Sequence, residues 1–287
     1  MPAVELVPHI ALLCNPRAGK GKALALSRRI MGKLAGENRS FSFFSDRWPE
    51  HFDDFSSVWL VGGDGTVHYF VNRYPLLTIP VALFKGGSGN DFAWKLYGDI
   101  SPGEYLDLAL QGNGKPVDVG ICNKKYFING VGIGFDGDVV KSMGKRKLLT
   151  AGYLSYLVVV LKNIFFFKER EMVIEVDGVV KCGRWFMLSV ANGSRYGGGF
   201  LVAPQADPVD GWFDVVLMKP ISRLKRLIYL PRMKKGRHLS LSFVEMVRAK
   251  HVVVNAGEVV PAHLDGELME TTQFEIRFSP QTMLFIY

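Results

Sequence analysis

The sequence contains little cysteine and lacks an apolar run long enough to span a membrane. Its three cysteines, Cys14, Cys122 and Cys182, lie far apart and fit neither a disulfide framework nor a zinc site, which favours a reducing compartment. The uncharged part of the most hydrophobic stretch, residues 148–167, is shorter than the roughly 20 residues of a spanning helix. We expect a core helix there, with an interfacial helix as the alternative. The N-terminus lacks the basic segment and apolar core of a signal peptide.

Acidic residues are missing where a dinucleotide-binding fold would need one. Residues 132–137 match Gly-x-Gly-x-x-Gly, but no Asp or Glu lies between Asp138 and Glu169. A dinucleotide fold places a ribose-binding acid about 20 residues after the glycines. We therefore interpret residues 132–137 as a glycine-rich turn.

Basic residues outnumber acidic ones by 35 to 27, which gives a formal net charge of +8. Two stretches concentrate this charge without any acidic residue: residues 141–147, and residues 223–238, where basic and apolar residues are interleaved. Such stretches are either solvated faces or surfaces that attract acidic lipid headgroups. No nucleic-acid-binding module is recognisable, so we expect an anionic membrane surface as the partner and no nucleic acid.

Residues 1–115 alternate apolar strands with helix-like segments, which predicts a doubly wound α/β domain. The first helix is predicted over residues 21–34 and the last over residues 102–110. Two glycines and a proline in residues 111–116 mark the end of this domain.

Residues 116–287 are dominated by strands separated by turn residues, which is typical of a mostly antiparallel β-sandwich. One long helix is expected over residues 148–168, and the last strand is expected to pair back with the first domain. The predicted strands are residues 117–121, 126–129, 172–176, 185–191, 213–218, 239–244, 251–254, 274–278 and 283–287.

A glycine-rich segment follows the buried strand predicted over residues 58–61. Gly62, Gly63 and Gly65 allow the backbone to approach an anion that any Cβ would keep away. Asp64 cannot bind a phosphate directly, because both are negative, so it implies a cation such as Mg²⁺ held through water. The alternative is a plain strand-to-helix turn.

Two more segments of this kind strengthen the first interpretation. The strand predicted over residues 81–84 leads into three glycines, a serine and the acidic residue Asp91 at a helix start. The strand predicted over residues 10–14 leads into small residues and lysines, over residues 15–23, which suit a polyphosphate. Together the three segments predict an anion site.

With these segments, the chain resembles the diacylglycerol kinase catalytic-domain family of lipid kinases nearly end to end. The family motifs correspond to Asn15–Ala23, Gly62–Thr66, Gly87–Ala93 (with Ser88 for Thr), Asp118, Gly132–Asp136 and Asp265–Glu267. More remotely, the glycine–Asp element is shared with NAD kinases.

The chain departs from the family pattern in three places. Lys85 and Trp94 stand where the family usually has Pro and Arg. Residues 41–57 lack the Thr-rich segment and the Gly-His-Ala helix that line the nucleotide in the family. The resemblance therefore says least about how adenosine is recognised.

The resemblance implies ATP as the phosphate donor and Mg²⁺ as the metal. It places Asp64, a catalytic residue, together with Asp91 and Asp118 in a cleft between the two domains, where they would hold Mg²⁺ largely through water. The nucleotide-binding residues that it implies are Asn15, Gly19, Gly21, Gly62, Gly63, Gly65, Thr66, Gly87, Ser88, Gly89 and Asn90.

The resemblance also assigns the general base to Glu267, which would remove the proton of a lipid hydroxyl. Asp265 would then be a turn or supporting residue; the alternative is a β-turn with two solvated acids. A structural Mg²⁺ is implied on Asp207, Asp210 and the main-chain oxygen of Trp212, and the alternative there is a hairpin loop.

The function that we expect is transfer of the ATP γ-phosphate to a lipid hydroxyl, with diacylglycerol as the first candidate and a sphingoid base or ceramide as the second. The alternatives are an NAD kinase-like enzyme and a catalytically dead protein that binds lipid or nucleotide. We expect a cytoplasmic protein that associates peripherally with the inner face of the membrane, and a homodimer is left open.

Overall fold

The computed structural model describes residues 8–145 and 153–287, and the contacts of the chain divide it into two units. The first unit comprises the chain up to Phe70, Tyr74–Val117 and Thr282–Tyr287, and the second comprises Val71–Arg73 and Asp118–Gln281. Residues 146–152, which carry part of the predicted basic stretch and of the predicted long helix, lie outside the described residues.

The first unit contains a six-stranded sheet in the order β2-β1-β3-β4-β16-β5. Strands β1 to β4 are parallel, and β16 pairs parallel to β4 and antiparallel to β5. The strands are β1 (His9–Cys14), β2 (Ser40–Phe44), β3 (Ser57–Gly62), β4 (Val81–Lys85), β5 (Gly114–Val117) and β16 (Met283–Ile286). Since β16 comes from the end of the chain, this sheet needs both ends of the described sequence.

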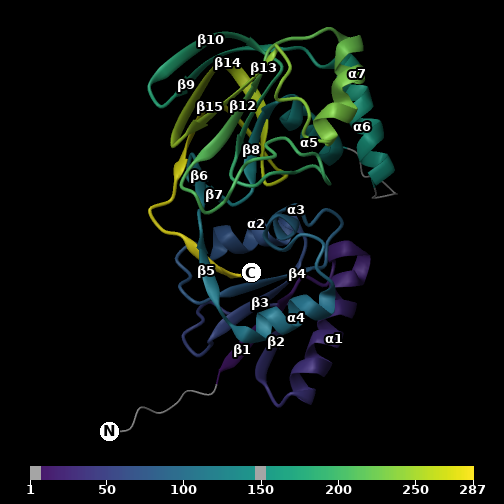
Figure 1. Ribbon diagram of the computed structural model, residues 1–287, viewed down its shortest axis with the longest axis vertical. Coiled ribbons are helices and arrows are strands. Elements are labelled where there is room, and N and C mark those ends of the chain that lie inside the picture. The colour runs from purple at the N-terminus through teal and green to yellow at the C-terminus, as the bar shows by residue number, and fades with distance from the viewer. Residues whose placement is uncertain (1–7, 146–152) are drawn as a thin grey trace. The chain divides into compact units, whose positions relative to one another are not determined.

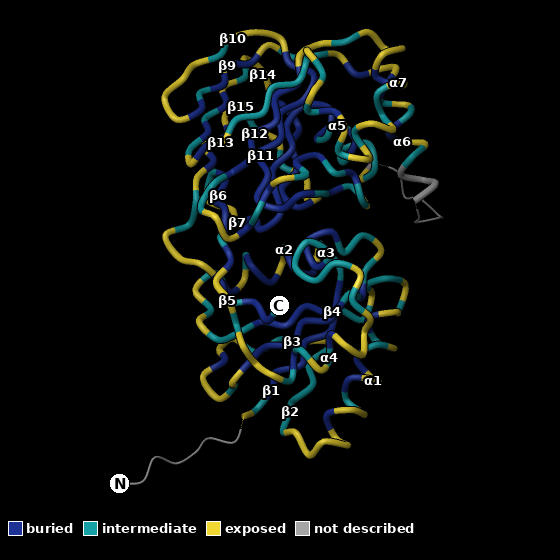
Figure 2. Tube along the Cα trace, viewed as in Figure 1, coloured by how far each residue is buried: buried dark blue, intermediate teal, exposed yellow. Residues whose placement is uncertain are grey.

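Helices cover both faces of this sheet, as the doubly wound pattern predicts (Figure 1). Helices α1 (Lys22–Gly36) and α4 (Pro102–Gln111) pack on one face, and α2 (Asp64–Arg73) and α3 (Asp91–Tyr97) follow the strands β3 and β4. Because β1, β3 and β4 are covered on both sides, nearly every residue in them is buried and apolar (Figure 2).

The second unit contains a ten-stranded antiparallel sheet, in agreement with the predicted sandwich. The order is β13-β12-β11-β8-β14-β15-β6-β7, and β9 pairs with β14 and with β10. The strands are β6 (Gly120–Cys122), β7 (Lys125–Phe127), β8 (Gly130–Gly134), β9 (Arg170–Val176), β10 (Val179–Trp185), β11 (Met187–Ala191), β12 (Phe213–Met218), β13 (Val244–Ala249), β14 (His251–Leu264) and β15 (Glu267–Phe278).

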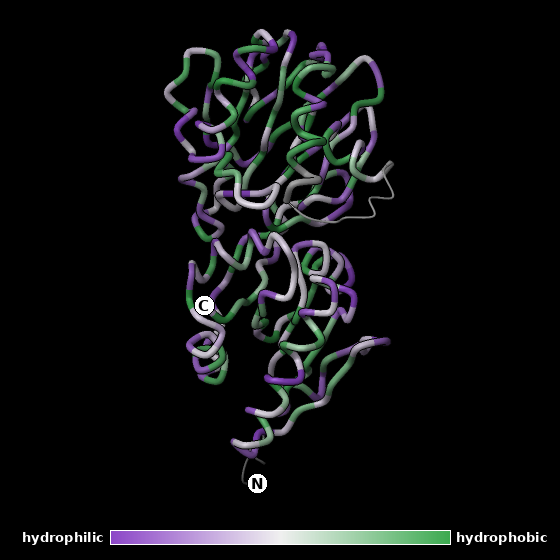
Figure 3. The backbone as a smooth tube through the Cα atoms, turned by 90° about the vertical axis from the view of Figure 1, so that its right-hand side faces the viewer, coloured by the Kyte–Doolittle hydropathy of each residue, from purple (hydrophilic) through white to green (hydrophobic). Residues whose placement is uncertain are grey.

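Two hydrophobic clusters hold the second unit together. One lies within the curved sheet, and the other lies between the sheet and the helices α5 (Phe135–Lys145), α6 (Tyr153–Phe166) and α7 (Arg223–Lys234). Figure 3 shows hydrophobic residues concentrated along the inner strands and hydrophilic ones at the outer turns. None of the helices in the described part of the chain is long and apolar enough to cross a membrane.

Several sequence predictions for residues 116–287 were wrong. The predicted strand 117–121 falls on parts of two strands, β5 and β6, and the predicted strand 185–191 falls on the end of β10 and on β11. Residues 239–243 form turns, and the strand predicted there begins only at Val244. The glycine-rich segment 132–137 is no turn, because it is the end of strand β8 and the start of helix α5. The predicted single long helix is wrong as well, since α7 and α5 are additional helices, and α7 lies in the basic stretch 223–238.

The glycines at the β8–α5 junction are explained by close packing on β14. A Cβ on Gly137 would overlap the carbonyl group of Pro261, whereas a Cβ on Gly144, in the same helix, would meet nothing within 4 Å. Gly137 therefore lets α5 lie directly on the backbone of β14.

This contact predicts opposite effects for two Gly→Ala substitutions in one helix. Gly137→Ala should lower the free energy of unfolding by about 1–3 kcal/mol, because the helix must move away from β14. Gly144→Ala should raise it by about 0.5–1 kcal/mol, because alanine is the better helix former. Urea unfolding followed by circular dichroism measures both, and equal stability of the two variants would contradict the packing.

Candidate active site

Three loops follow the carboxyl ends of the neighbouring parallel strands β1, β3 and β4, so they lie at one edge of the first unit's sheet. Asn15 ties the first loop to the second: its backbone N–H donates to Val61 O (3.1 Å) and its Nδ2 donates to Thr66 Oγ1 (3.0 Å). Asn90 shapes the third loop, because its Oδ1 accepts from Gly87 N (2.8 Å) and its Nδ2 donates to Gly87 O (3.0 Å). The predicted nucleotide-binding loops are thus brought together.

Glycines allow these loops to touch through their backbones. A Cβ on Gly63 would lie 2.8 Å from Gly87 Cα, and a Cβ on Gly89 would lie 2.6 Å from Asp64 Oδ2. Gly19 has a positive φ of 58°, and a Cβ there would overlap the carbonyl oxygen of Gly86. A side chain at Gly63 would therefore push the loops after β3 and β4 apart. Anion binding at Gly63 stays a prediction.

Among the remaining predicted residues of these loops, Gly62 and Thr66 are buried, and a Cβ on Gly62 would overlap the Thr66 side chain. Gly65 and Ser88 are exposed, and Gly21 has a positive φ of 91° with nothing within 4 Å of the position of a Cβ. Exposed backbone and hydroxyl groups at this edge of the sheet are accessible to an anion from solvent.

Asp64 and Asp91 lie close together, each at the first residue of a helix. Asp64 Oδ1 accepts a hydrogen bond from the backbone N–H of Phe92 (3.4 Å), at the start of α3. Burial, and then the charge of Asp91, raise the pKa of Asp64 to about 6, although the backbone N–H groups of residues 90–92 oppose the shift. A cation between the two carboxylates would relieve their repulsion, so the pair fits a divalent metal.

Asp118 lies in the second unit, beside the loop that carries Asp207 and Asp210. Its Oδ2 accepts from Gly211 N (2.8 Å), and its backbone N–H donates to Pro208 O (2.7 Å). Burial raises the pKa of the Asp118 carboxyl, the Gly211 N–H lowers it, and the charges of Asp210 and Asp207 raise it again. Asp118 is thus placed with the predicted structural-metal loop, and its convergence with Asp64 and Asp91 stays a prediction.

Other groups of the protein already contact Asp210 and Trp212 in that loop. Asp210 accepts from the backbone N–H of Trp212 (3.0 Å) through Oδ1 and forms an ion pair with Arg248 through Oδ2. Lys250 and Arg248 also lie over the ring of Trp212. These contacts favour the hairpin alternative for residues 207–212.

Neither predicted metal site is complete in protein side chains. In residues 8–145 and 153–287, no three His, Cys, Asp or Glu side chains are grouped closely enough to hold a metal ion. The carboxylate pair of Asp64 and Asp91 would need water and phosphate oxygens as the other ligands, which is how proteins commonly hold Mg²⁺.

The two acids of the Asp-Gly-Glu segment differ in burial and in hydrogen bonding. Asp265, with a positive φ of 51°, is buried, and its carboxylate accepts from the backbone N–H groups of Ile128 (3.0 Å), Asn129 (2.8 Å) and Gly130 (3.0 Å). Glu267, two residues on, is the exposed first residue of β15. The supporting role expected of Asp265 therefore has a structural basis, and Glu267 is the acid that is accessible to a substrate.

A buried polar cluster next to this segment was missed by the sequence analysis. Asp136 accepts a hydrogen bond from the hydroxyl of Tyr196, whose ring packs edge-on against His263 at 4.9 Å between centroids. Burial raises the pKa of Asp136 to about 6, against the Tyr196 hydrogen bond, and burial lowers the pKa of His263 to about 4, against the Asp265 charge. Asp136 belongs to a family motif, but the sequence contains no signal for Tyr196.

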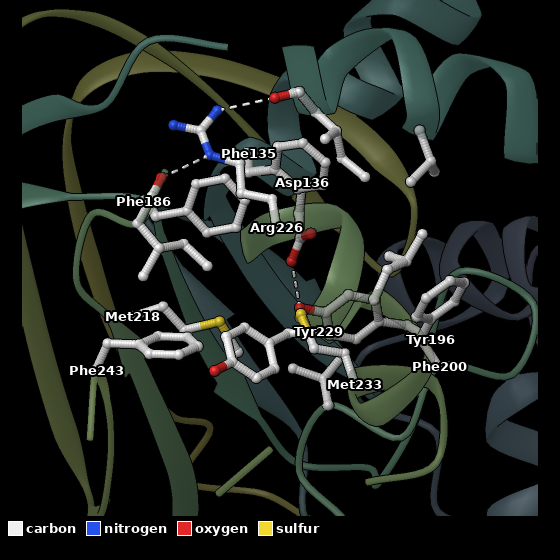
Figure 4. Close-up of a pocket in the computed structure, with 15 residues that line it drawn as sticks. Phe135, Asp136, Phe186, Tyr196, Phe200, Met218, Arg226, Tyr229, Met233 and Phe243 are labelled. Carbon is white, nitrogen blue, oxygen red and sulfur yellow. Dashed lines mark hydrogen bonds between the residues drawn. The ribbon is translucent and has the colours of Figure 1, made fainter. Parts of the chain in front are cut away.

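Asp136 and Tyr196 also line an apolar pocket of about 40 Å³ (Figure 4). The other lining groups are mostly aromatic and aliphatic side chains from helices α5, α6 and α7, strand β12 and the segments that connect these elements. An engineered apolar cavity of about 150 Å³ takes up benzene. This pocket is smaller, so in this form it cannot hold a lipid chain.

An α/β unit with three glycine-rich loops, followed by an antiparallel sheet unit with an Asp-Gly-Glu turn, is the arrangement expected of the phosphotransferases to which NAD kinases and lipid kinases belong. Residues 9–122 match the family model for the diacylglycerol kinase catalytic domain, and residues 129–287 match the YegS C-terminal NAD kinase beta sandwich-like domain. The chain belongs to the lipid kinase family that these two models describe together, and the predicted membership is confirmed.

Named relatives agree with this membership. The chain is 28% identical to a diacylglycerol kinase of Bacillus subtilis, over 75% of this chain and 72% of that protein. It is 27% identical to a diacylglycerol kinase of Mycobacterium tuberculosis, over 79% and 75%. A solved structure of a diacylglycerol kinase from Bacillus anthracis shares the fold, with a TM-score of 0.73, 21% identity and coverage of 99% of this chain and 97% of that one.

The raised pKa of Asp64 predicts a pH-dependent effect of Asp64→Asn on stability. The folded protein keeps the Asp64 proton up to about pH 6, whereas an ordinary carboxyl loses it near 3.8, so the charged form opposes folding at pH 7. Asp64→Asn should therefore raise the urea midpoint at pH 7 and leave it nearly unchanged at pH 4. The exposed Asp53→Asn is the control, and a lower midpoint for Asp64→Asn at pH 7 would show that the carboxylate is favourably held.

Proposed function

We propose that this chain transfers the γ-phosphate of ATP to the hydroxyl group of diacylglycerol and so produces phosphatidic acid. The observation that carries the proposal is the pairing of Asp64 with Asp91 at the edge where three glycine-rich loops meet. Relatives named diacylglycerol kinase support the choice of lipid.

In this proposal the three loops hold the phosphates of the nucleotide. Asn15 and Asn90 keep the loops in shape, while the backbone of Gly21 and Gly65 and the hydroxyl of Ser88 are accessible to phosphate oxygens. Asp64 and Asp91 would hold Mg²⁺, which would neutralise charge that develops on the transferring phosphoryl group.

Glu267 would act as the general base. It would accept the proton of the lipid hydroxyl while the hydroxyl oxygen forms a bond to the γ-phosphorus and the bond to the β–γ bridging oxygen breaks, releasing ADP. Asp265 would hold the turn that presents Glu267, through its three backbone hydrogen bonds. The proposal requires residues of both units to serve one reaction.

The rival functions differ in their phosphate acceptor. A sphingoid-base or ceramide kinase, an NAD kinase-like enzyme and a catalytically dead binding protein would each give a different product pattern. Incubation with radiolabelled ATP, Mg²⁺ and diacylglycerol, ceramide, sphingosine or NAD separates them. Label in phosphatidic acid supports the proposal, whereas label only in another product, or in none, contradicts it.

Glu267→Gln tests the general base. The variant keeps the size and most hydrogen bonding of the side chain but loses its basicity, so kcat should fall at least about 100-fold with nearly normal ATP and lipid binding. Its urea midpoint should match that of the wild type, because Glu267 is exposed.

Asp265→Asn is the matched comparison for Glu267→Gln. Its amide would turn N–H groups toward backbone donors, so it should lose about 1–3 kcal/mol of stability. Near-normal turnover by Glu267→Gln, together with an inactive but folded Asp265→Asn, would show that the base is wrongly assigned.

We also propose that the lipid is met at an anionic membrane surface, toward which the basic stretch 223–238 is attracted. Replacing Lys234, Lys235 and Arg237 by glutamine should weaken binding to anionic vesicles, at about 1 kcal/mol per basic residue, and added salt should weaken wild-type binding. Turnover of a soluble short-chain diacylglycerol should stay normal. Salt-independent binding by both proteins would leave this stretch as a solvated face.

A further inference from the structure

Helix α7 presents three aliphatic side chains to solvent, and its one fully buried side chain is charged. Leu224 is 67% exposed, Leu227 36% and Ile228 58%, and their i, i+3, i+4 spacing places them on one face of the helix. Arg226 is buried on the other side, only 6% exposed. The core-facing side of α7 also carries the half-buried Tyr229, Leu230 and Met233. The helix is therefore apolar on two sides, whereas a surface helix of a globular unit is usually apolar only on the side that faces the core.

Arg226 fixes this orientation. Its guanidinium donates to the carbonyl oxygens of Ile164 (3.0 Å) and Phe167 (3.1 Å), at the end of α6, and forms an ion pair with Glu169. The same group lies over the ring of Phe186, 4.9 Å from its centroid (Figure 4). Rotating α7 to bury Leu224 and Leu227 would leave the Arg226 charge without these partners, so the exposure of this face is built into the fold.

Helix α6, which contacts α7, also carries exposed apolar side chains. Phe166, at its end, is 73% exposed, and Val158 and Phe165 are also exposed, at positions that share one side of the helix. The two helices are in contact and lie side by side (Figure 1). We call the exposed residues Val158, Phe165, Phe166, Leu224, Leu227 and Ile228 the α6–α7 apolar surface.

The charged side chains of α6 and α7 are all positive. The exposed cations on these two helices and just beyond the end of α6 are Lys162, Lys168, Arg223, Lys225, Arg232 and Lys234. The sequence contains no Asp or Glu between Asp138 and Glu169, or between Asp214 and Glu245. Acidic side chains do lie near the end of α6, where Phe166 shares a pocket with Asp138, Glu169 and Glu258, but none belongs to α6 or α7. An apolar surface on two helices that carry cations and no acids complements the interface of a lipid bilayer with anionic headgroups.

We propose that the α6–α7 apolar surface inserts into the interfacial layer of an anionic membrane while its flanking cations contact the headgroups. This inference rests on the proposed function, and it adds the docking surface and the apolar contribution to binding. A second copy of the chain is the weaker candidate for this surface, because a symmetric contact would bring like charges together.

The test compares two sets of exposed apolar residues in the second unit. The first variant is Leu224→Ser/Leu227→Ser/Ile228→Ser on α7. The matched control is Val179→Ser/Val180→Ser/Val259→Ser, which removes three apolar side chains that are each more than half exposed and lie outside the surface. Thermal unfolding first establishes that each variant folds.

Co-sedimentation with vesicles of phosphatidylcholine alone and with added phosphatidylglycerol then measures binding. The α7 variant should lose at least about tenfold in partition to the anionic vesicles, because three inserted side chains are removed, while the control should change by less than about twofold. A separate α6 variant, Phe165→Ser/Phe166→Ser, should show a loss of the same kind, so the test does not depend on one helix.

Three outcomes would overturn the proposal: unchanged partition of the α6 and α7 variants, an equal loss in the control, or a dimer that the α7 variant converts to monomer in lipid-free sedimentation. Turnover of soluble short-chain diacylglycerol, measured in parallel, separates this proposal from the proposed function. Vesicle binding that depends on α7 without any lipid phosphorylation would disprove the function and support the surface. Normal turnover, with vesicle partition that does not depend on α7, would support the proposed function and disprove the docking surface.

Discussion

The candidate nucleotide site depends on the contact between the backbones of Gly63 and Gly87. No side chain fits between them, since a Cβ on either residue would clash with the Cα of the other. This contact joins the loops after β3 and β4, and each loop continues directly into a helix whose first residue is an aspartate. The two carboxylates are therefore held near each other by backbone packing, against their own repulsion. A site that is strained in this way is suited to a cation, whose binding would remove the strain.

Much of this first unit could be predicted from the sequence because its signals are local. The buried strands, the glycines that follow them and the acids at the helix starts are contiguous in the chain, and the structure has them in the expected order. What could not be predicted is the partner of each glycine. The sequence shows that Gly63 needs to be small, but it does not show whether an anion or Gly87 requires it.

The second unit was predicted less well because its elements depend on distant contacts. The helix α5 begins within a glycine-rich segment, where local propensity argues for a turn, and it forms because Gly132 and Gly137 let it lie on β14, more than a hundred residues later. Likewise, Asp265 and Glu267 look alike in the sequence. The backbone N–H groups of residues 128–130 donate hydrogen bonds to the carboxylate of Asp265, and only the fold brings those donors to it.

Helix α7 shows why a basic stretch cannot be interpreted from its charge alone. The sequence of residues 223–238 counts Arg226 among seven cations available to a partner, but the structure removes it from the surface and uses it to cap α6. The same burial turns three aliphatic residues outward, which the sequence pattern would assign to the core. A purely electrostatic surface would lose its partner in high salt, whereas one that also carries apolar side chains should keep part of its binding. The orientation of one buried arginine therefore decides which kind of surface this helix presents.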